Sequence, residues 1–505
     1  MNQPYMPLLS VLKNKEEIFV TDVSRKQYVF EELSLDDFLF QNLNESLREN
    51  EFDKFTLYIL KKLLSFINEL ILNNLKIRSP SLVSREIRKF LDSLSGFINI
   101  SYLGPQITFH DAPRFYHFSC AAFQKDPKDD KEVNIWGSGV SLYPEEAIRK
   151  SIYECIERIL FSSYKKENFR LAKIKELDQK FDPLNFKFFA DFQYQKGSLV
   201  NHKVSENSLL YWLLGKDLFT EENIWIPAQL VYWNYKLEEF EPRLWDINSN
   251  GEALGSSFQQ ALVNAIYELI ERDSFMICWL KKIVPKRINL KTINDKEIIY
   301  MLEKFERYNL DLNVCKLDNE FGLNVYLAVI RDFTEVGPAV TVSASCHLDK
   351  MKSIKKAILE ATKVYHYTRY LMRTNKEPQS SFLGQKERLL LWSQKKMLAE
   401  IDWLLQGEII NEDFSQTHFL DFKQQLDYLK TKLKESQIRC FFVDITPKNL
   451  KKKNLWAIRA ISPDLVPLHL KEEFVHLGVK RLYKHYEGSL LNSKDDFNTL
   501  PHPFS

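Results

Sequence analysis

The chain has 505 residues, of which 45% are hydrophobic, and its 70 basic and 68 acidic residues leave a formal net charge of +2. Such a chain can bury the core of two or more domains. Its balanced charge disfavours a nucleic-acid partner, because there is no surplus of cations for the phosphates. The six cysteines lie far apart and include no C-x-x-C pair, so neither a zinc site nor a disulfide framework is expected.

No segment of the sequence is typical of secretion or of a membrane span. The N-terminal residues lack a cationic stretch followed by a long apolar core. The longest apolar region, 57–75, is interrupted by Lys61, Lys62 and Glu69, whereas a membrane span needs about 20 apolar residues. We therefore expect a soluble, cytoplasmic protein without a membrane partner.

The predicted elements change in character near residue 100. Before it, short strands at IFVTDV and QYVF precede helices, including the region 57–75, where apolar residues recur at helical spacing. After it, strands and helices alternate, and strands are expected at 115–123, 224–233, 323–330, 339–346, 439–446 and 455–461. We also expect an amphipathic helix at 422–438 and a solvated, lysine-rich turn at 448–454. This pattern predicts an α/β or α+β fold with an N-terminal segment 1–100 and one large domain 101–505.

Two nearly identical heptapeptides, IYECIER at 152–158 and IYELIER at 266–272, stand in helical patterns at 144–160 and 258–275. At about 100° per residue, the apolar residues of each helix fall on one side. The opposite side carries Glu154, Glu157, Arg158, Glu268, Glu271 and Arg272. We therefore expect each helix to face the core on one side and to offer two carboxylates and a guanidinium on the other.

One E-x-x-E-R pattern is common on solvated helices, but two copies favour a shared site. Neighbouring carboxylates ~5 Å apart would repel by about 3 kcal/mol per pair at an effective dielectric constant near 20, so such a cluster needs cations. Carboxylate oxygens suit Mg²⁺, and guanidinium groups bind phosphate oxygens as planar forks. The repeat therefore predicts a nucleoside triphosphate bound together with magnesium.

Small residues precede both helices, in GSGVS at 137–141 and in SNGEALGSS at 249–257. We expect loops there whose backbone N–H groups can approach a phosphate, although ordinary helix caps have the same composition. The chain has no G-x-x-x-x-G-K-[ST] and no G-x-G-x-x-G after a strand, which disfavours the familiar nucleotide-binding folds. A third segment, 353–371, repeats the rhythm with Glu360 and is equally compatible with a plain core helix.

These features together resemble the YcaO family over roughly residues 100–505. The resemblance lies in a G-x-G-like loop before A-x-x-x-x-x-x-E-x-x-E-R, in SNG-x-x-x-G before A-x-x-x-x-x-x-E-x-x-E-R-D, and in the strand 325–332 followed by a helix with Glu360. The end TLPHPFS (499–505) resembles the proline-rich C-terminus of the YcaO cyclodehydratases, which form azoline rings in ribosomally made peptides. The resemblance implies a YcaO-type fold, with pseudo-symmetric helices packed on β-sheets and a mostly helical N-terminal segment.

The resemblance further implies ATP-dependent activation of a peptide bond. A Cys, Ser or Thr side chain of a precursor peptide would attack the preceding backbone carbonyl, the oxyanion would take the γ-phosphoryl group of ATP, and loss of phosphate would leave a thiazoline or oxazoline. By motif position, Mg²⁺ would be held by Glu154, Glu157, Glu268 and Glu271. ATP would be contacted by Glu154, Arg158, Asn250, Ser256, Gln260, Glu268, Arg272 and Glu360.

The tail is a separate candidate for the catalytic site. By the same resemblance, its segment PHPFS, with Pro501, His502, Pro503 and Ser505, would enter the active site, because its prolines limit its flexibility. The terminal carboxylate or His502 would then lie near the reacting amide. Deleting 501–505 or adding a C-terminal tag is expected to abolish ring formation and to leave the fold intact.

The sequence departs from the pattern of the family at several positions. Val140 replaces the lysine often found between the glycines of the first loop, and Ser141 replaces the second glycine. Gln260 stands where an acidic residue is common. Lys363 and Tyr365 stand where the family often shows a glutamine and then an arginine. All four motif glutamates are retained, so an active site is expected.

The resemblance also implies partners. They are a precursor peptide of a bacteriocin-like cluster, a separate E1-like partner protein that binds the leader peptide, and a flavin-dependent dehydrogenase that oxidises azolines. Residues 1–100 would suit the docking of a partner or peptide, and a homodimer is left open. Two alternatives remain: a YcaO enzyme that forms thioamides or amidines, and a non-catalytic scaffold subunit of a modification complex.

Overall fold

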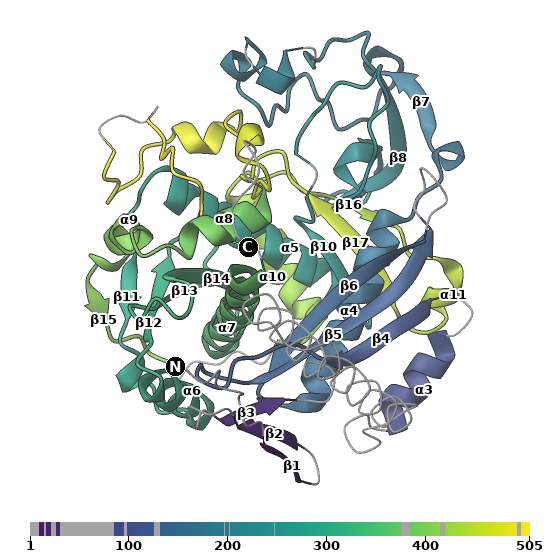
Figure 1. The fold of residues 1–505 in the computed structure, drawn as a ribbon. Helices are drawn as coiled ribbons and strands as arrows, with labels where there is room; N and C mark the ends of the chain where they lie inside the picture. Colours follow the sequence, from purple (N-terminus) through teal and green to yellow (C-terminus); the bar gives the residue numbers. More distant parts are fainter. Residues whose placement is uncertain are drawn as a thin grey trace, which may run out of the picture. The chain divides into compact units, whose positions relative to one another are not determined.

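Figure 1 shows a computed structural model of the chain. It describes residues 10–14, 17–21, 27–30, 85–94, 98–125, 132–195, 197–200, 202–246, 248–374, 384–414, 420–491 and 496–504. The chain divides into two compact units: unit 1 comprises Met1–Phe123 and Asn134–Cys155, and unit 2 comprises Gln124–Val133 and Ile156–Ser505. The predicted domains, 1–100 and 101–505, rest on sequence texture and stay a prediction.

Unit 1 contains two three-stranded sheets. The first has the order β1-β2-β3, with β1 Ser10–Asn14, β2 Glu17–Thr21 and β3 Gln27–Phe30. The second has the order β4-β5-β6, with β4 Asn99–Pro105, β5 Tyr116–Lys125 and β6 Glu132–Ser141. Among its described residues, the helices are α3 Arg85–Leu94 and the first part of α4 Pro144–Ser162, in which the boundary of the unit falls. The strands expected at IFVTDV, QYVF and 115–123 are thereby confirmed, and the expected helix at 57–75 lies outside the described residues.

The expectation of a loop at 137–141 is wrong, because these residues form the end of β6. A Cβ atom on Gly137 would lie 2.2 Å from the backbone nitrogen of Cys155, and one on Gly139 would lie 2.1 Å from the carbonyl oxygen of Ala147. Both neighbours belong to α4. The glycines therefore allow the strand to pack directly against the helix, and this close approach explains the small residues without a phosphate.

Unit 2 is built on two larger sheets. One has the order β10-β17-β16-β8-β7, with β9 paired to β8, and the other has the order β14-β13-β12-β11-β15. Neighbouring strands run antiparallel except β11 and β15. The strands are β7 Arg170–Lys173, β8 Leu209–Asp217, β9 Asn223–Pro227, β10 Glu252–Gly255, β11 Lys286–Ile288, β12 Asp311–Leu317, β13 Asn324–Arg331, β14 Val340–His347, β15 Ile409–Ile410, β16 Phe441–Asp444 and β17 Trp456–Ile461. The helices that complete unit 2 are α5 Phe258–Leu280, α6 Lys296–Arg307, α7 Lys350–Thr374, α8 Gln385–Trp392, α9 Met397–Ile401, α10 Phe422–Glu435 and α11 Lys448–Lys451.

Helix α5 is the central element of unit 2 (Figure 1). It packs against β10 and β17 of one sheet, against β14 of the other sheet, and against α10. Ser257 caps its first turn by accepting a hydrogen bond from the backbone N–H of Gln260. The expectation of one core face and one polar face is wrong for this helix, because sheets on two sides bury Glu271 and Asp273 as well. Glu271 of the second repeat is therefore buried, whereas Glu268 and Arg272 are partly exposed.

Three other expectations are corrected or refined. The strand expected at 224–233 ends at Pro227, where the chain turns and the buried side chain of Gln229 hydrogen-bonds Pro242 and Leu244. The segment 249–257 is not all loop, because β10 occupies its middle and pairs with β17. The lysine-rich turn at 448–454 contains the short helix α11. The strands expected at 323–330, 339–346, 439–446 and 455–461 and the helices at 353–371 and 422–438 are confirmed.

The structure also bears on the expected cysteine chemistry. All six cysteines are buried and none forms a disulfide. Burial raises the pKa of Cys315 to about 12 and that of Cys440 to about 12, so these thiols are protonated and unreactive at neutral pH. None of the helices in the described part of the chain combines the length and the apolar character that crossing a bilayer requires.

Candidate nucleotide-binding site

The second E-x-x-E-R motif forms an acidic cluster with one arginine inside unit 2. Nη2 of Arg272 lies 3.2 Å from Oε1 of Glu268, and its Nη1 lies 3.6 Å from Oε1 of Glu271. Burial raises the pKa of Glu271, and the charges of Glu268 and Glu360 add to this, whereas Arg272 and Lys356 lower it. Three carboxylates from α5 and α7 therefore act on one another electrostatically, and a bound cation would relieve their repulsion.

The first motif reaches the strand that precedes α5. Oε2 of Glu157 accepts a hydrogen bond of 2.7 Å from the backbone N–H of Leu254 in β10. Arg158, the next residue, is exposed. The pKa of Glu252, also in β10, responds to both residues, because the negative charge of Glu157 raises it and the positive charge of Arg158 lowers it. Glu157 and Arg158 therefore lie in the same electrostatic environment as the second motif.

A buried ion pair that the sequence analysis missed lies beside this cluster. Glu252 and Arg459 are 4% and 0% exposed, and Nη1 of Arg459 donates to Oε1 of Glu252. Nη2 of Arg459 donates to the backbone and side-chain oxygens of Asn248, at 3.1 and 3.3 Å. Burial raises the pKa of Glu252 well above its usual value, and the carboxylates of Glu157 and Glu268 raise it further. A glutamate in the otherwise apolar strand EALG was the available sequence signal.

Glu154 belongs to unit 1 and is positioned there by β6. Its Oε2 accepts hydrogen bonds from the backbone N–H and the hydroxyl of Ser138, at 2.8 and 3.1 Å. The small residues of GSGVS therefore do supply donors to an acidic group, but this group is a side chain of the protein. The sequence analysis did not single out Ser138 as a positioning residue, although it lies within GSGVS, residues 137–141. The sharing of Mg²⁺ by Glu154 and the other three motif glutamates stays a prediction.

The other predicted ATP contacts make hydrogen bonds within the protein. Asn250 is buried, and its side chain bonds both the carbonyl oxygen and the N–H of Leu468, at 2.8 and 3.3 Å. Oε1 of Gln260 accepts from the N–H and the hydroxyl of Ser256, at 2.8 and 2.6 Å. Glu360 pairs with Lys363 at 2.6 Å. The predicted ATP contacts of Asn250, Ser256, Gln260 and Glu360 are not tested by these bonds and stay predictions.

The proline-rich tail lies in the interior of unit 2 near the second motif. Trp392 donates to the carbonyl oxygen of Pro501 at 2.9 Å, and His502 is fully buried. Phe504 is buried too, and the guanidinium carbon of Arg272 lies 4.5 Å from the centre of its ring. The predicted catalytic residue Ser505 lies outside the described residues. The tail therefore reaches an arginine of the repeat, and the catalytic roles of Pro501, His502 and Pro503 stay predictions.

This set of residues fits a magnesium–nucleotide complex. Oxygen donors from Glu157, Glu268 and Glu271 are the type that Mg²⁺ prefers, and Arg158 and Arg272 offer planar forks for phosphate. Oε2 of Glu252 is buried and has no hydrogen-bond partner among the residues that the structure describes. A buried carboxylate oxygen without a partner costs free energy, and a cation that bound nearby would lower that cost.

Comparison with known proteins places the chain in a family. A family model described as YcaO cyclodehydratase, ATP- and Mg²⁺-binding, matches residues 136–466. The chain belongs to the YcaO family. The matched region contains both E-x-x-E-R motifs, and the predicted cofactors, ATP and Mg²⁺, are those of the family model.

Solved structures show the same fold. A heterocyclase in complex with substrate and cofactor superposes with a TM-score of 0.66 at 18% identity, covering 83% of this chain and 57% of that one. YcaO from Methanopyrus kandleri, bound with AMPPCP and Mg²⁺, superposes with a TM-score of 0.52 at 14% identity, covering 76% of this chain and 90% of that one. The predicted fold, a YcaO-type arrangement of helices on β-sheets, is therefore confirmed.

A relative found by sequence is an uncharacterized protein of Methanothermobacter thermautotrophicus. It is 24% identical over 247 residues, which make up 47% of this chain and 62% of that protein. The chain thus spans about three fifths of the length of this relative. Identity at this level to an uncharacterized protein assigns no substrate to this chain.

Proposed function

We propose that this protein is an ATP-dependent enzyme that cyclises Cys, Ser or Thr residues of a ribosomally made precursor peptide to thiazoline or oxazoline. The observation that carries this proposal is the contact of the proline-rich tail with Arg272, inside the acidic cluster of a YcaO protein. ATP supplies the phosphoryl group that turns the carbonyl oxygen of the substrate into a leaving group. The residues of the chain bind, orient and neutralise charge around that transfer.

The proposed roles are supported by the place of each residue in the two motifs and by the chemistry of its side chain. Glu157, Glu268 and Glu271, together with Glu154, offer the oxygens that would hold Mg²⁺. Arg158 is exposed at the surface of α4, whereas Arg272 is held between carboxylates and a ring. Fixed cations at a transferring phosphoryl group are the expected source of rate acceleration, because they need no reorganisation during the reaction.

The buried position of His502 bears on the proposed role of the tail. Its Nε2 donates to the carbonyl oxygen of His469 at 3.0 Å, and burial together with nearby Arg388 holds its pKa well below the usual value. A neutral imidazole with no exposed surface is a poor proton carrier for a substrate. We therefore propose that the tail acts mainly by structure, with Pro501 and Pro503 shaping it and His502 anchoring it.

The proposal includes partner proteins. A precursor peptide needs a protein that recognises its leader, and an E1-like partner would serve this purpose. A flavin-dependent dehydrogenase would convert azolines to azoles. Co-purification of the protein with products of neighbouring genes, followed by size-exclusion chromatography, tests these interactions, and a chain that modifies its peptide alone would refute the need for a partner.

ATP hydrolysis separates an enzyme from a scaffold subunit. We expect Mg²⁺-dependent hydrolysis by the wild-type protein, loss of it in Glu157→Ala and Glu268→Ala, and no change in Glu303→Ala. Glu303 lies on α6, where it is exposed and remote in sequence from the motifs, so it is a matched control. A wild-type protein that binds no Mg²⁺–AMPPCP would refute the proposed enzyme.

Mass spectrometry identifies the reaction. A candidate peptide, incubated with the protein, its partner and Mg²⁺–ATP, should lose one water per modified residue if azolines form. Exchange of oxygen for sulfur would identify thioamide formation, the alternative that the same ATP site could serve. An unchanged peptide mass despite ATP hydrolysis would refute cyclisation of that peptide.

A further inference from the structure

The tail, defined here as residues 496–504, runs back along α5 toward the second motif. Near its start, the N–H of Asn498 donates to the carbonyl oxygen of Leu280 at 2.7 Å. Next, Nε1 of Trp279 donates to the carbonyl oxygen of Leu500 at 3.0 Å. At its end, the ring of Phe504 lies 4.7 Å from that of Phe275, as measured between centroids. The tail is therefore antiparallel to α5 and delivers its last described residue to the turn that carries Arg272.

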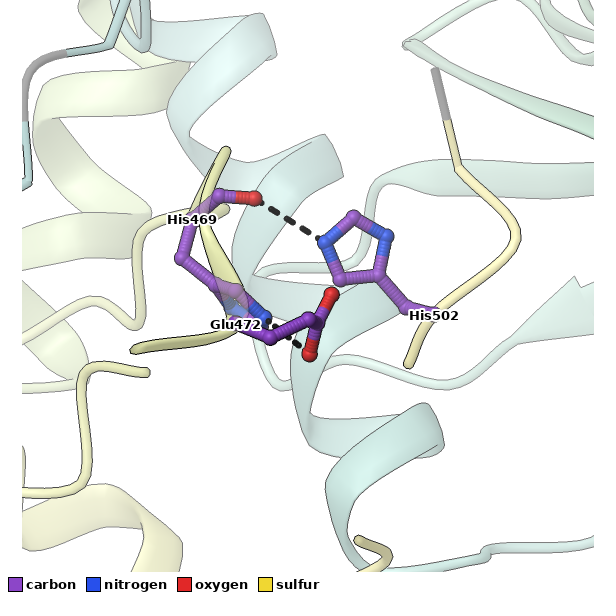
Figure 2. A group of neighbouring side chains, drawn as sticks. All are labelled: His469, Glu472 and His502. Atoms are coloured by element: carbon purple, nitrogen blue, oxygen red, sulfur yellow. Dashed lines mark hydrogen bonds and ion pairs between the residues drawn. The ribbon is translucent and has the colours of Figure 1, made fainter. Parts of the chain in front are cut away.

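Four polar side chains hold the end of the tail, and we call them the latch: the buried His469, His502 and Arg388 and the partly exposed Glu472. Nε2 of His469 lies 3.2 Å from Oε2 of Glu472, and Nε2 of His502 lies 3.0 Å from the carbonyl oxygen of His469 (Figure 2). Nη1 of Arg388 donates to the carbonyl oxygen of Leu470 at 2.7 Å, and its Nη2 lies 3.5 Å from the carbonyl oxygen of Phe504. The latch thus joins the tail to the segment 469–472.

The latch also resembles a metal site. His469, Glu472 and His502 each offer one ligand atom, and these three atoms all lie within 4.8 Å of one another. Two observations favour hydrogen bonds over an ion. The ring nitrogen of His502 that faces the group must carry a proton, because the carbonyl oxygen opposite it can only accept (Figure 2). Glu472 already pairs with the guanidinium of Arg388 at 3.3 Å, and this cation would repel a divalent ion. These side chains therefore hold the tail against the segment 469–472 by hydrogen bonds.

The latched tail restrains the guanidinium of Arg272 on its flat face. The guanidinium carbon lies 4.5 Å from the centre of the Phe504 ring, and Glu268 and Glu271 lie at its nitrogens. Phe504 is 3% exposed, so the contact is desolvated and stronger than a cation–π contact at the surface. A ring on one face and carboxylates at the edges leave the guanidinium little freedom to rotate.

We propose that Phe504 is a positioning residue for Arg272: the latch fixes the tail so that the Phe504 ring holds this guanidinium in the orientation required for nucleotide phosphate. The inference rests on the proposed function, because it assigns phosphate to Arg272. It differs from a catalytic role of the tail, since Phe504 acts only through Arg272. An arginine that is ordered before phosphate arrives loses less entropy on binding and so binds more tightly.

The test measures binding of Mg²⁺–AMPPCP by calorimetry. Phe504→Leu keeps an apolar side chain and removes the aromatic face, and we expect affinity to fall about three- to tenfold. Phe504→Tyr keeps the face and should retain the affinity. Phe497→Leu is the matched control, because Phe497 lies in the same tail and its ring lies 4.8 Å from Nζ of Lys281, away from Arg272. It should leave the affinity unchanged.

A double-mutant cycle with Arg272→Lys separates positioning from general loss of structure. Lysine keeps the charge and lacks the planar fork, so Phe504→Leu should have no further effect on affinity in that background. Thermal unfolding of each variant verifies the fold, and Phe504→Met, which fills the space flexibly, replaces Phe504→Leu if the latter does not fold.

The outcomes distinguish the two proposals. A wild-type protein that does not bind Mg²⁺–AMPPCP refutes the proposed function and this inference with it. Normal binding by folded Phe504→Leu, or equal losses from Phe504→Leu and Phe497→Leu, refutes the inference alone. One equivalent of zinc that co-purifies with the protein and is absent from His502→Gln would show that the latch is a metal site and would overturn its description as a hydrogen-bonded group.

Discussion

Replacement of Arg459 by methionine should destabilise the protein more than replacement of both members of its ion pair. The side chains of Arg459 and Glu252 are 0% and 1% exposed. Removal of one therefore leaves the other buried, with neither its ion-pair partner nor water to solvate it. Breaking a buried pair in this way costs about 3–5 kcal/mol, whereas a pair of apolar residues of similar volume is often tolerated. Glu252→Leu/Arg459→Met should therefore be more stable than Arg459→Met.

The dependence on pH gives this prediction a second test. Burial and the neighbouring carboxylates raise the pKa of Glu252, and the charge of Arg459 opposes them. Without Arg459, the native carboxyl should keep its proton at pH values where the unfolded chain has released it. The deficit of Arg459→Met in free energy of unfolding should then grow as the pH rises above the ordinary value of 4.5.

Urea unfolding, followed by tryptophan fluorescence at about pH 5 and pH 8, measures both effects. The double variant lacks this carboxyl and should change least between the two pH values, whereas the wild-type protein and Arg459→Met should both lose stability at the higher pH, and Arg459→Met should lose more. A double variant less stable than Arg459→Met, or a deficit that shrinks as the pH rises, would refute the reasoning.

Three further predictions concern other groups. Glu271→Gln should abolish Mg²⁺-dependent ATP hydrolysis, which a phosphate-release assay measures. It should leave the melting temperature of the free protein unchanged or raise it, because burial raises the pKa of this carboxyl and so disfavours its charged form; thermal unfolding tests this. Gly139→Ala should lower the melting temperature strongly, since its Cβ would lie 2.1 Å from the carbonyl oxygen of Ala147, whereas Gly384→Ala should change it little because only a flexible glutamate tip is near. Burial lowers the pKa of His476 from 6.5 to about 3, so unfolding takes up a proton and stability should fall by up to about 1.4 kcal/mol per pH unit as the solution is acidified below 6.5. Urea titrations at several pH values below 6.5 should show that the free energy of unfolding depends less steeply on pH in His476→Gln than in the wild-type protein. An unchanged dependence on pH would contradict this assignment.

The repeated motif was the most informative part of the sequence. Apolar residues at helical spacing predicted α4 and the start of α5, and the charge on the remaining positions predicted a cluster that needs cations. Glu268, Glu271 and Arg272 do lie together. This succeeded because spacing along one helix fixes the relative positions of residues three and four apart, whatever the rest of the chain does.

The partners that surround this motif could not be predicted from local patterns. Arg459 meets Glu252 across a β-ladder from 207 residues away, and Phe504 meets Arg272 by way of a tail without regular structure. The glycines of GSGVS were assigned to a loop because composition does not reveal that a helix packs on them. In the first two cases the decisive neighbour is distant in sequence, and in the third it belongs to the helix that directly follows; a single sequence carries no signal for either kind of packing.

The antiparallel course of the tail along α5 has a consequence for the time at which the site is completed. Leu500 follows Trp279 by 221 residues, and synthesis at about 5–20 residues per second therefore separates them by roughly 10–45 s. During that interval α5 lacks the hydrogen bonds and the rings that the tail contributes. The nascent chain should therefore bind nucleotide more weakly until the tail has been made and has packed against α5.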